Sequence, residues 1–235
     1  MRHSFARVTI ASRRAIATAL ALSIAGLGVI AAPAAGGSGL KVPKKVQITD
    51  PAGDANFLNS QGGDVPIGED NPTPADLSAP DILSVWFTRD AKSVAVHIQT
   101  EAPPSAQDAY KFAVTVNPES ADGCLFFEVF IPGTTWVGGT ASARLLSCQD
   151  GDIGSAEDVP GRLKITELTD GSGVMTATFP RWASRALADG EALKSPSARS
   201  QLITGSATGV NALFLTVFAD RTKPGKDYAI RRRAR

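Results

Sequence analysis

The residues that could do chemistry are concentrated in one acidic segment. Positions 46–88 contain seven aspartate and glutamate residues and no lysine or arginine. The first turn of this segment carries the oxygen-bearing side chains of Asp50, Asp54 and Asn56, and Gly53 permits the turn. Calcium takes about six to eight oxygen ligands from carboxylates, carbonyls and waters. The spacing is not that of an EF-hand loop, but it predicts a calcium site, with an Asx-turn on a solvated acidic surface as the alternative interpretation.

Catalytic groups of other kinds are sparse. Only His97 of the two histidines lies outside the first 34 residues, so a serine or cysteine triad would depend on that single ring. The sequence has no nucleophile elbow, phosphate-binding loop, zinc motif or dinucleotide fingerprint. It therefore favours a protein that is not an enzyme. Because acidic residues are plentiful, a small extracellular hydrolase that uses paired carboxylates is the alternative.

Aromatic side chains form the second group of candidate binding residues. Trp86 lies on the polar side of an expected strand, Trp136 lies in a glycine-rich loop, and Tyr110 is a further candidate. An exposed aromatic ring can stack on the face of a sugar. We therefore name Trp86 and Trp136 as candidate glycan-binding residues. The alternative is that both indole rings fill the core.

The chain has two cysteines, Cys124 and Cys148, which we expect to form a disulfide in an exported protein. The segments that follow Cys124 and precede Cys148 are strand-like. Setting the cysteines opposite each other in an antiparallel pair places Glu128 opposite Arg144 and leaves one face nearly all apolar. A shift by one residue would lose both features. The bond would close a loop of about 25 residues, worth about 3.5 kcal/mol in the chain-entropy model.

Strict alternation predicts a hairpin from strands 82–88 and 93–100 around a turn at Asp90-Ala91. This pairing puts six apolar side chains on the core face: Leu83, Val85, Phe87, Val94, Val96 and Ile98. The opposite face is expected to be partly wet and carries Ser84, Trp86, His97 and Gln99.

Further strands are predicted by apolar alternation or by continuous apolar runs. They are 111–117, 124–131, 141–148, 162–168, 173–180 and 212–219. Many short strands and turn signals predict an all-β fold, an antiparallel β-sandwich of jelly-roll or immunoglobulin-like kind. One short helix is expected near 181–189 and a polar loop at 190–210.

The N-terminus has the three parts of an export signal: four arginines and no acid in residues 1–14, an apolar run over 15–32, and small residues after it. We predict a signal peptide over 1–34, a linker over 35–47, a β-sandwich domain over 48–230 and a basic tail over 231–235. The mature protein would be secreted or held in the cell envelope without a membrane span. Arg13-Arg14 resembles the twin-arginine export motif, which is an alternative route.

Removal of the signal leaves 20 basic against 23 acidic residues, and five of those bases lie in the last ten positions. The folded body is therefore mildly acidic, which argues against nucleic acid as a partner. The basic tail is either a solvated end or a contact to an anionic wall or membrane.

Two short stretches resemble DOMON-like domains, a group that includes carbohydrate-binding module family 9 and the C-terminal domain of glucodextranase-type enzymes. They are DPAGDAN followed by PDILSVWFTRDAKSVAVHIQT, and ALFLTVFADRTKPGKDYAI near the C-terminus. The resemblance implies a secreted β-sandwich with a structural calcium, near Asp50, Asp54 and Asp81, that binds sugars or haem. Haem-binding members use Met and His ligands, and here His97 and Met175 offer one pairing only.

These observations lead to one expected function and two alternatives. We expect a secreted, non-catalytic binding module whose partner is an extracellular glycan or cell-wall polymer, with Ca²⁺ ordering the 50–81 loop. The alternatives are the paired-carboxylate hydrolase and a structural envelope protein with no small ligand.

Overall fold

The computed structural model describes residues 40–55, 77–120, 124–134, 140–149, 152–153, 159–206 and 213–231. The chain divides into the units Met1–Ala34 and Ala35–Arg235, and the described residues all belong to the second unit. The predicted signal peptide therefore lies outside the described residues, as do the tail residues after Arg231. Within the described ranges, no helix has the length and apolar character needed to span a membrane.

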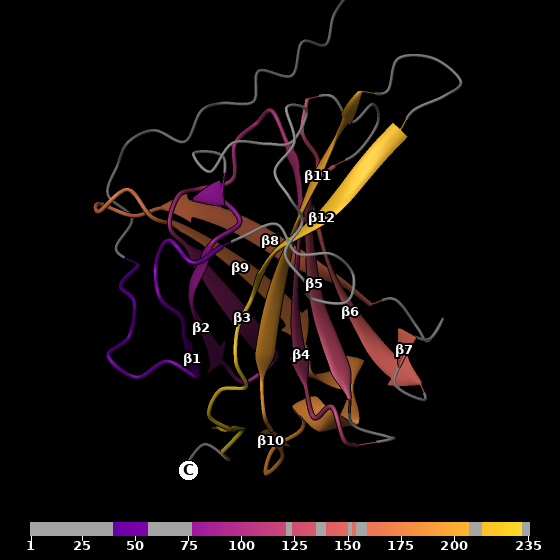
Figure 1. Cartoon of the computed structure of the whole chain (residues 1–235). Coiled ribbons are helices and arrows are strands. Elements are labelled where there is room, and N and C mark those ends of the chain that lie inside the picture. Colours follow the sequence, from indigo (N-terminus) through magenta and orange to yellow (C-terminus); the bar gives the residue numbers. More distant parts are fainter. Residues whose placement is uncertain are drawn as a thin grey trace, which may run out of the picture. The chain divides into compact units, whose positions relative to one another are not determined.

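The protein is all-β, and its described regular structure consists of strands and isolated 3₁₀ turns (Figure 1). The strands are β1 (Ile48–Thr49), β2 (Ile82–Arg89), β3 (Ser93–Thr100), β4 (Ala109–Val116), β5 (Leu125–Ile131), β6 (Ser142–Gln149), β7 (Asp152–Ile153), β8 (Val159–Glu167), β9 (Gly173–Pro180), β10 (Ala192–Leu193), β11 (Ser197–Ser206), β12 (Leu213–Arg221) and β13 (Tyr228–Ala229). The turns are η2 (Arg181–Ala183) and η3 (Arg185–Leu187).

One antiparallel sheet curls over to make both layers of the sandwich. Its strands follow the order β1-β2-β3-β9-β8-β6-β5-β4-β11-β12, with β7 paired to β6. The layers are joined through β6 and β8, which pair over Ala143–Leu145 and Val159–Gly161. A side chain at Gly161 would collide with the ring of Phe179, so glycine lets β8 pass close to the core.

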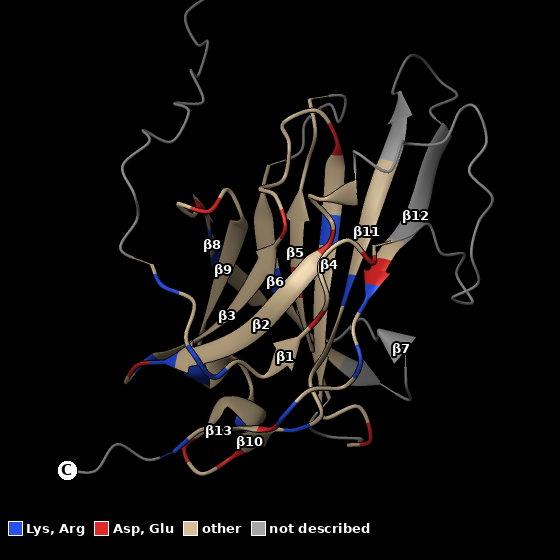
Figure 2. Ribbon diagram, turned by 60° about the vertical axis from the view of Figure 1, so that its left-hand side comes forward, with Lys and Arg blue, Asp and Glu red and all other residues tan. Residues whose placement is uncertain are grey.

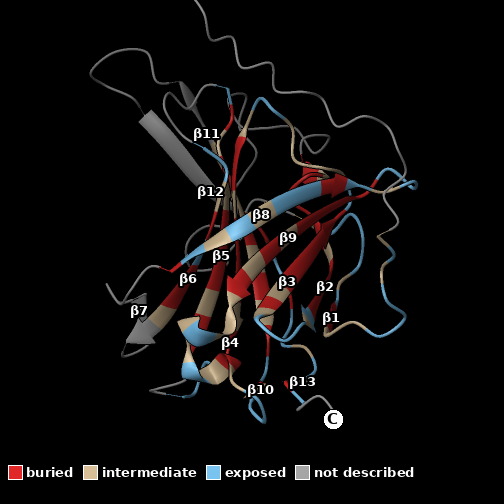
Figure 3. Ribbon diagram, turned by 180° about the vertical axis from the view of Figure 1, so that it is seen from behind, coloured by how far each residue is buried: buried red, intermediate tan, exposed pale blue. Residues whose placement is uncertain are grey.

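The core lies between the two halves of this curled sheet. Phe127 of β5 packs on Phe87 of β2, with ring centroids 5.7 Å apart, and edge-on against Phe179 of β9 at 5.5 Å. Figure 3 shows that β3 and β9 are largely buried, whereas β8 presents much of its length to solvent. This contrast matches the sequence, because β9 alternates buried apolar residues while β8 carries charged ones.

The predicted register of the cysteine hairpin is confirmed. Leu125 pairs with Ser147, Phe127 with Leu145, and Glu128 with Arg144. Four apolar residues of β5 face the core, namely Leu125, Phe127, Val129 and Ile131, and Glu128 forms an ion pair with Arg144 on the other face.

The predicted register of the first hairpin is wrong by two residues. Phe87 pairs with Val96 and Val85 with Ile98, because the turn is centred one residue later than expected. A shift of two residues preserves the face, so Val85 and Phe87 still point into the core. Leu83 is the exception. It is an extra residue between the pairs of Ile82 and Ser84, so Ile82 takes the core position and Leu83 is only partly buried.

The expected wet face of this hairpin is also wrong, because all four of its residues are buried: Ser84, Trp86, His97 and Gln99. Their polar groups bond to one another and to neighbouring strands. Ser84 Oγ donates to Gln99 Oε1 at 2.8 Å, and Gln99 Nε2 donates to Ser172 Oγ at 3.1 Å. Polar side chains satisfied in this way can be buried at little cost, which the alternation pattern alone does not reveal.

Two further expectations are corrected near the C-terminus. The helix expected at 181–189 is two separate 3₁₀ turns, because Ser184 adopts an extended backbone between them and its hydroxyl accepts from Ala186 N. The loop expected at 190–210 contains the ten-residue strand β11. Its sequence is mostly polar, but Ala198 and Leu202 alternate into the core.

Candidate metal-binding site

Four aspartates from distant parts of the chain meet where the two edges of the sheet approach each other, at the neighbouring ends of β2 and β12 (Figure 2). Asp50 directly follows β1, Asp54 lies in the next turn, Asp81 directly precedes β2, and Asp220 lies in β12. Carboxylate oxygens of Asp50, Asp54 and Asp220 lie within 4.8 Å of one another. Oxygens on opposite sides of a bound Ca²⁺ are about 5 Å apart, so this spacing suits a shared calcium ion.

Hydrogen bonds from the backbone hold the carboxylates in place. Ile82 N donates to Asp220 Oδ2 at 2.8 Å, which ties β2 to β12 across the seam. Gly53 N donates to Asp81 Oδ2 at 2.6 Å and so fixes the turn between Asp50 and Asp54. Gly53 has φ +76°, a left-handed conformation that glycine adopts without strain. The hydrogen bond between Gly53 and Asp81 thus positions the carboxylates of Asp50 and Asp54 on either side of the turn.

Burial makes the negative charges of this cluster costly. It raises the pKa of Asp50 to about 6 and that of Asp81 to about 6, and the neighbouring carboxylates add to both shifts. Burial also raises the pKa of Asp220 to about 7, with further contributions from the other three aspartates. The charge of exposed Lys223 lowers the pKa of Asp50, but burial outweighs it.

Two carboxylate oxygens at the site lack any hydrogen-bond partner although they are buried. They are Asp50 Oδ2 and Asp81 Oδ1, and Asp81 as a whole is 0% exposed. Within the described part of the chain, no lysine or arginine forms an ion pair with any of the four aspartates. A buried oxygen left unsatisfied is costly, and a bound cation would satisfy it. The donor set is made of hard oxygen atoms, which fits Ca²⁺.

The structure brings together three of the four residues predicted as metal ligands. Asp50 and Asp54 belong to the close group, Asp81 supports their turn, and Asn56 lies outside the described residues. Sequence reasoning missed Asp220. The signal that could have found it is the Ala-Asp-Arg step at the end of the apolar run 212–219, where a charged residue directly follows the run.

The predicted aromatic residues do not form an open platform in the described structure. Trp86 is 3% exposed and Tyr110 is fully buried in the core, while Trp136 lies outside the described residues. The Trp86 ring stacks on the His97 ring, with centroids 4.9 Å apart and planes 5° from parallel. The tryptophan that the structure does expose is Trp182 in η2, which the sequence analysis did not single out.

His97 is held by its neighbours as a buried, neutral ring. Nε2 lies 2.7 Å from Thr88 Oγ1 and Nδ1 lies 3.0 Å from Thr176 Oγ1. Burial lowers the pKa of His97 to about 4. His97 pairs with Thr176, and the adjacent Met175 points into the core on the other face of the sheet. The two side chains therefore lie on opposite faces and do not converge on one ligand.

The confirmed register places Cys124 and Cys148 one step beyond the last paired residues, Leu125 and Ser147. The side chain of Cys148 lies outside the described residues. The disulfide therefore stays a prediction that the strand register favours.

Comparison of the chain with models of protein families, with characterised proteins and with solved structures finds no match. The likeness to DOMON-like domains consequently rests on the two sequence stretches quoted above, and the function must be argued from the geometry.

Proposed function

We propose that this protein is a secreted, non-catalytic binding module in which Ca²⁺ closes the seam of the β-sandwich. The observation that carries the proposal is the pair of buried carboxylate oxygens without hydrogen-bond partners, in a cluster with which no basic residue of the described chain forms an ion pair. A divalent cation would supply the missing positive charge to the whole cluster. Asp50, Asp54 and Asp220 would hold it, and Asp81 would position their turn.

The burial of the cluster favours a structural ion over the hydrolase alternative. A glycosidase must bring both carboxylates to opposite sides of a bond in its substrate. Here Asp81 is fully buried and Asp220 is 4% exposed, so a polysaccharide could not reach both from solvent. Asp54 is the one exposed member of the group. Burial and the neighbouring carboxylates raise the pKa values of Asp50, Asp81 and Asp220, and a bound cation would favour the charged form of these side chains.

Calcium would act by joining segments that only a few hydrogen bonds hold together. β1 has two residues and pairs with β2 alone, and Asp220 reaches β2 through one bond to Ile82 N. An ion shared by Asp50 and Asp220 would fasten β1 to β12. The domain would then present its loops to an extracellular glycan or cell-wall polymer from a rigid frame.

Thermal unfolding of the mature protein tests this proposal. At a calcium concentration about 100 times Kd, binding to the folded state alone adds about 2.7 kcal/mol. We expect the midpoint in Ca²⁺ to exceed that in EDTA by about 5–10 °C. Asp54→Asn should remove most of this difference, whereas Asp90→Asn, an exposed aspartate in the β2–β3 turn, should leave it intact. Equal midpoints in Ca²⁺ and EDTA would refute the calcium site.

A measurement of reducing-sugar release from a panel of polysaccharides distinguishes the proposed binding module from the paired-carboxylate hydrolase. The proposed module releases none, with or without calcium. Release that Asp220→Asn abolishes would support the hydrolase instead.

A further inference from the structure

Trp182 stands out among the apolar side chains of the described structure. It is 80% exposed, and Ile165 is the one other large hydrophobic residue exposed in the described ranges. Soluble domains usually bury tryptophan or use it for contact with a partner, because the ring is large and mostly apolar. A single exposed apolar side chain is common, so the exposed ring makes Trp182 a candidate contact for a partner only together with the groups around it.

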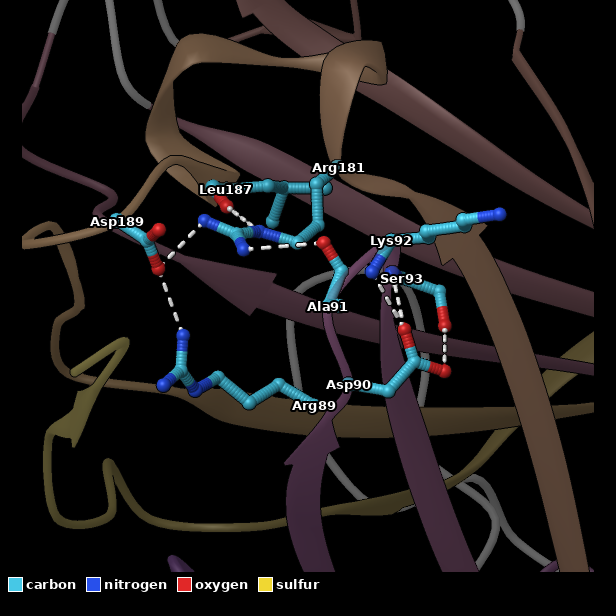
Figure 4. Close-up of polar contacts among 8 residues, drawn as sticks. All are labelled: Arg89, Asp90, Ala91, Lys92, Ser93, Arg181, Leu187 and Asp189. Carbon is cyan, nitrogen blue, oxygen red and sulfur yellow. Dashed lines mark hydrogen bonds and ion pairs between the residues drawn. The ribbon is translucent and has the colours of Figure 1, made fainter. Parts of the chain in front are cut away.

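Hydrogen bonds of Arg181 anchor the turn that carries Trp182 to the β2–β3 turn and to η3. Arg181 N donates to Lys92 O at 2.9 Å, and the Arg181 guanidinium donates to Leu187 O at 3.2 Å and Ala91 O at 3.4 Å (Figure 4). Leu187 of η3 is fully buried in the core. An aromatic ring on so well-anchored a turn loses little conformational freedom when it binds a partner.

Positive charge surrounds this turn. Arg89 and Arg181 both contact the same oxygen of Asp189, each at 2.7 Å, so two cations share one carboxylate (Figure 4). Lys92 and Arg162 are exposed beside them. A second carboxylate, Asp90, lies among the same neighbours, where it accepts from Lys92 N and Ser93 N at 2.7 Å each and from Ser93 Oγ.

A hollow of about 570 Å³ adjoins the turn. Lys92, Arg162, Pro160 and Pro180 are among its lining residues, and Pro180 immediately precedes η2. This volume is within the range of small-ligand sites, about 300–1,000 Å³. Two prolines, two cations and the carboxylate of Asp90 thus line the hollow, and Trp182 follows the lining residue Pro180 by two positions in the chain.

We propose that Trp182, Lys92 and Arg162 form a binding site for an acidic polysaccharide, one whose sugar rings carry carboxylates. The indole ring would stack on a pyranose face while Lys92 and Arg162 pair with its carboxylate. The inference rests on the proposed function in that it takes the domain to be a binding module. An anionic membrane would require several apolar side chains to insert, whereas the described residues expose only two large ones, Trp182 and Ile165.

Calorimetric titration of the mature protein with tetragalacturonate, a short polymer of uronic acid, tests the site. We expect binding that weakens with added salt, no binding of neutral maltotetraose, and at least a tenfold loss for Trp182→Ala. Trp182→Phe should keep part of the affinity, and Lys92→Gln with Arg162→Gln should reduce both the affinity and its salt dependence. Ile165→Ala is the matched control and should bind as the wild type does. Because Trp182 is exposed, its variants should keep the wild-type unfolding midpoint.

Three results would overturn the inference. They are equal binding by Trp182→Ala and wild type, no binding of tetragalacturonate by wild type, and stronger binding to phosphatidylglycerol vesicles than to the sugar. If EDTA abolished binding of tetragalacturonate and Trp182→Ala retained it, the sugar would bind at the aspartate cluster. That result would also overturn the inference. The calcium proposal is tested separately by the unfolding midpoint, so either can fail alone.

Discussion

Two regions of this protein bury carboxylates in opposite ways. Glu128 lies on β5 at 3% exposure, where it accepts from Lys111 Nζ at 2.6 Å and from Arg144. Burial acts to raise the pKa of Glu128, but the hydrogen bonds and charges of Lys111 and Arg144 outweigh it, so the pKa lies below its usual value. At the seam, Asp81 and Asp220 are equally buried without such bases, and their pKa values lie well above the usual value.

The difference shows what burial demands of a carboxylate. Both regions remove charge from water, and that cost must be offset by an opposite charge or by a proton. On β5 the neighbouring strands β4 and β6 supply that charge. At the seam the described chain supplies none in direct contact, so a proton or an external cation must do so. In the proposed function, Ca²⁺ supplies that charge.

The largest expected effect concerns the hairpin that carries Glu128, because its predicted disulfide would fasten it covalently. Replacing both Cys124 and Cys148 with serine should lower the free energy of unfolding by about 3.5 kcal/mol, since the unfolded chain gains the freedom of a loop of about 25 residues. Urea unfolding measures this loss. A reducing agent should destabilise the wild type by a similar amount and leave the double variant unchanged; no response in the wild type would contradict the bond.

Glu128→Gln tests the region in which basic side chains offset the charge of the buried carboxylate. The glutamine keeps the shape but removes the charge that Lys111 and Arg144 share, so we expect a loss of about 2 kcal/mol. Because no calcium is involved, urea unfolding should give the same loss in Ca²⁺ and in EDTA. A loss that depended on calcium would mean that the two regions are not independent.

His97 extends the comparison to a buried base without an acidic partner. Its pKa of about 4 in the folded protein lies below the usual value near 6.5, because burial disfavours the charged ring. The neutral His97 ring therefore makes its full contribution to the free energy of unfolding above pH 6.5. This contribution is lost as the pH falls towards 4. At pH 5 the loss is on the order of 1–2 kcal/mol. His97→Gln should lose less stability than the wild type between pH 7 and 5, as thermal unfolding in EDTA can measure; parallel profiles would refute this.

Asp220→Asn gives the smallest effect but the most informative sign. In EDTA the variant should be more stable than the wild type by about 1 kcal/mol, because it removes one of several repelling charges while its side-chain oxygen can still accept from Ile82 N. In Ca²⁺ it should be less stable, because a ligand is lost. Thermal midpoints in both conditions show the reversal. Destabilisation in EDTA would mean that the charge of Asp220 is already compensated within the chain.

Much of the fold could be predicted because alternation is a local signal. β3 and β9 have the predicted bounds, and the pairing of Glu128 with Arg144 fixed the register of β5 and β6. The first hairpin was placed two residues out because its turn does not carry a unique marker, and the bulge at Leu83 leaves no trace in the apolar pattern. β11 was missed because few of its residues are apolar.

The candidate site could be predicted in part for a similar reason. Asp50 and Asp54 are neighbours in sequence around a glycine, so their convergence is local. Asp220 joins them through the path of the whole sheet, which no local spacing encodes. The burial of Trp86 likewise depends on contacts made across the fold. The sequence could not indicate that Trp182, a few residues after a strand, would be the exposed ring.

The distance along the chain between Asp50 and Asp220 has a consequence for biogenesis. A growing polypeptide cannot assemble the cluster until nearly all of the domain has left the ribosome or the translocation channel, since β12 is among its last strands. A shortened product that ends before β12 would carry the first turn but could not capture the ion with it. If the signal directs export, Ca²⁺ would join β1 to β12 only in the calcium-rich exterior. The domain would then complete its folding where it acts.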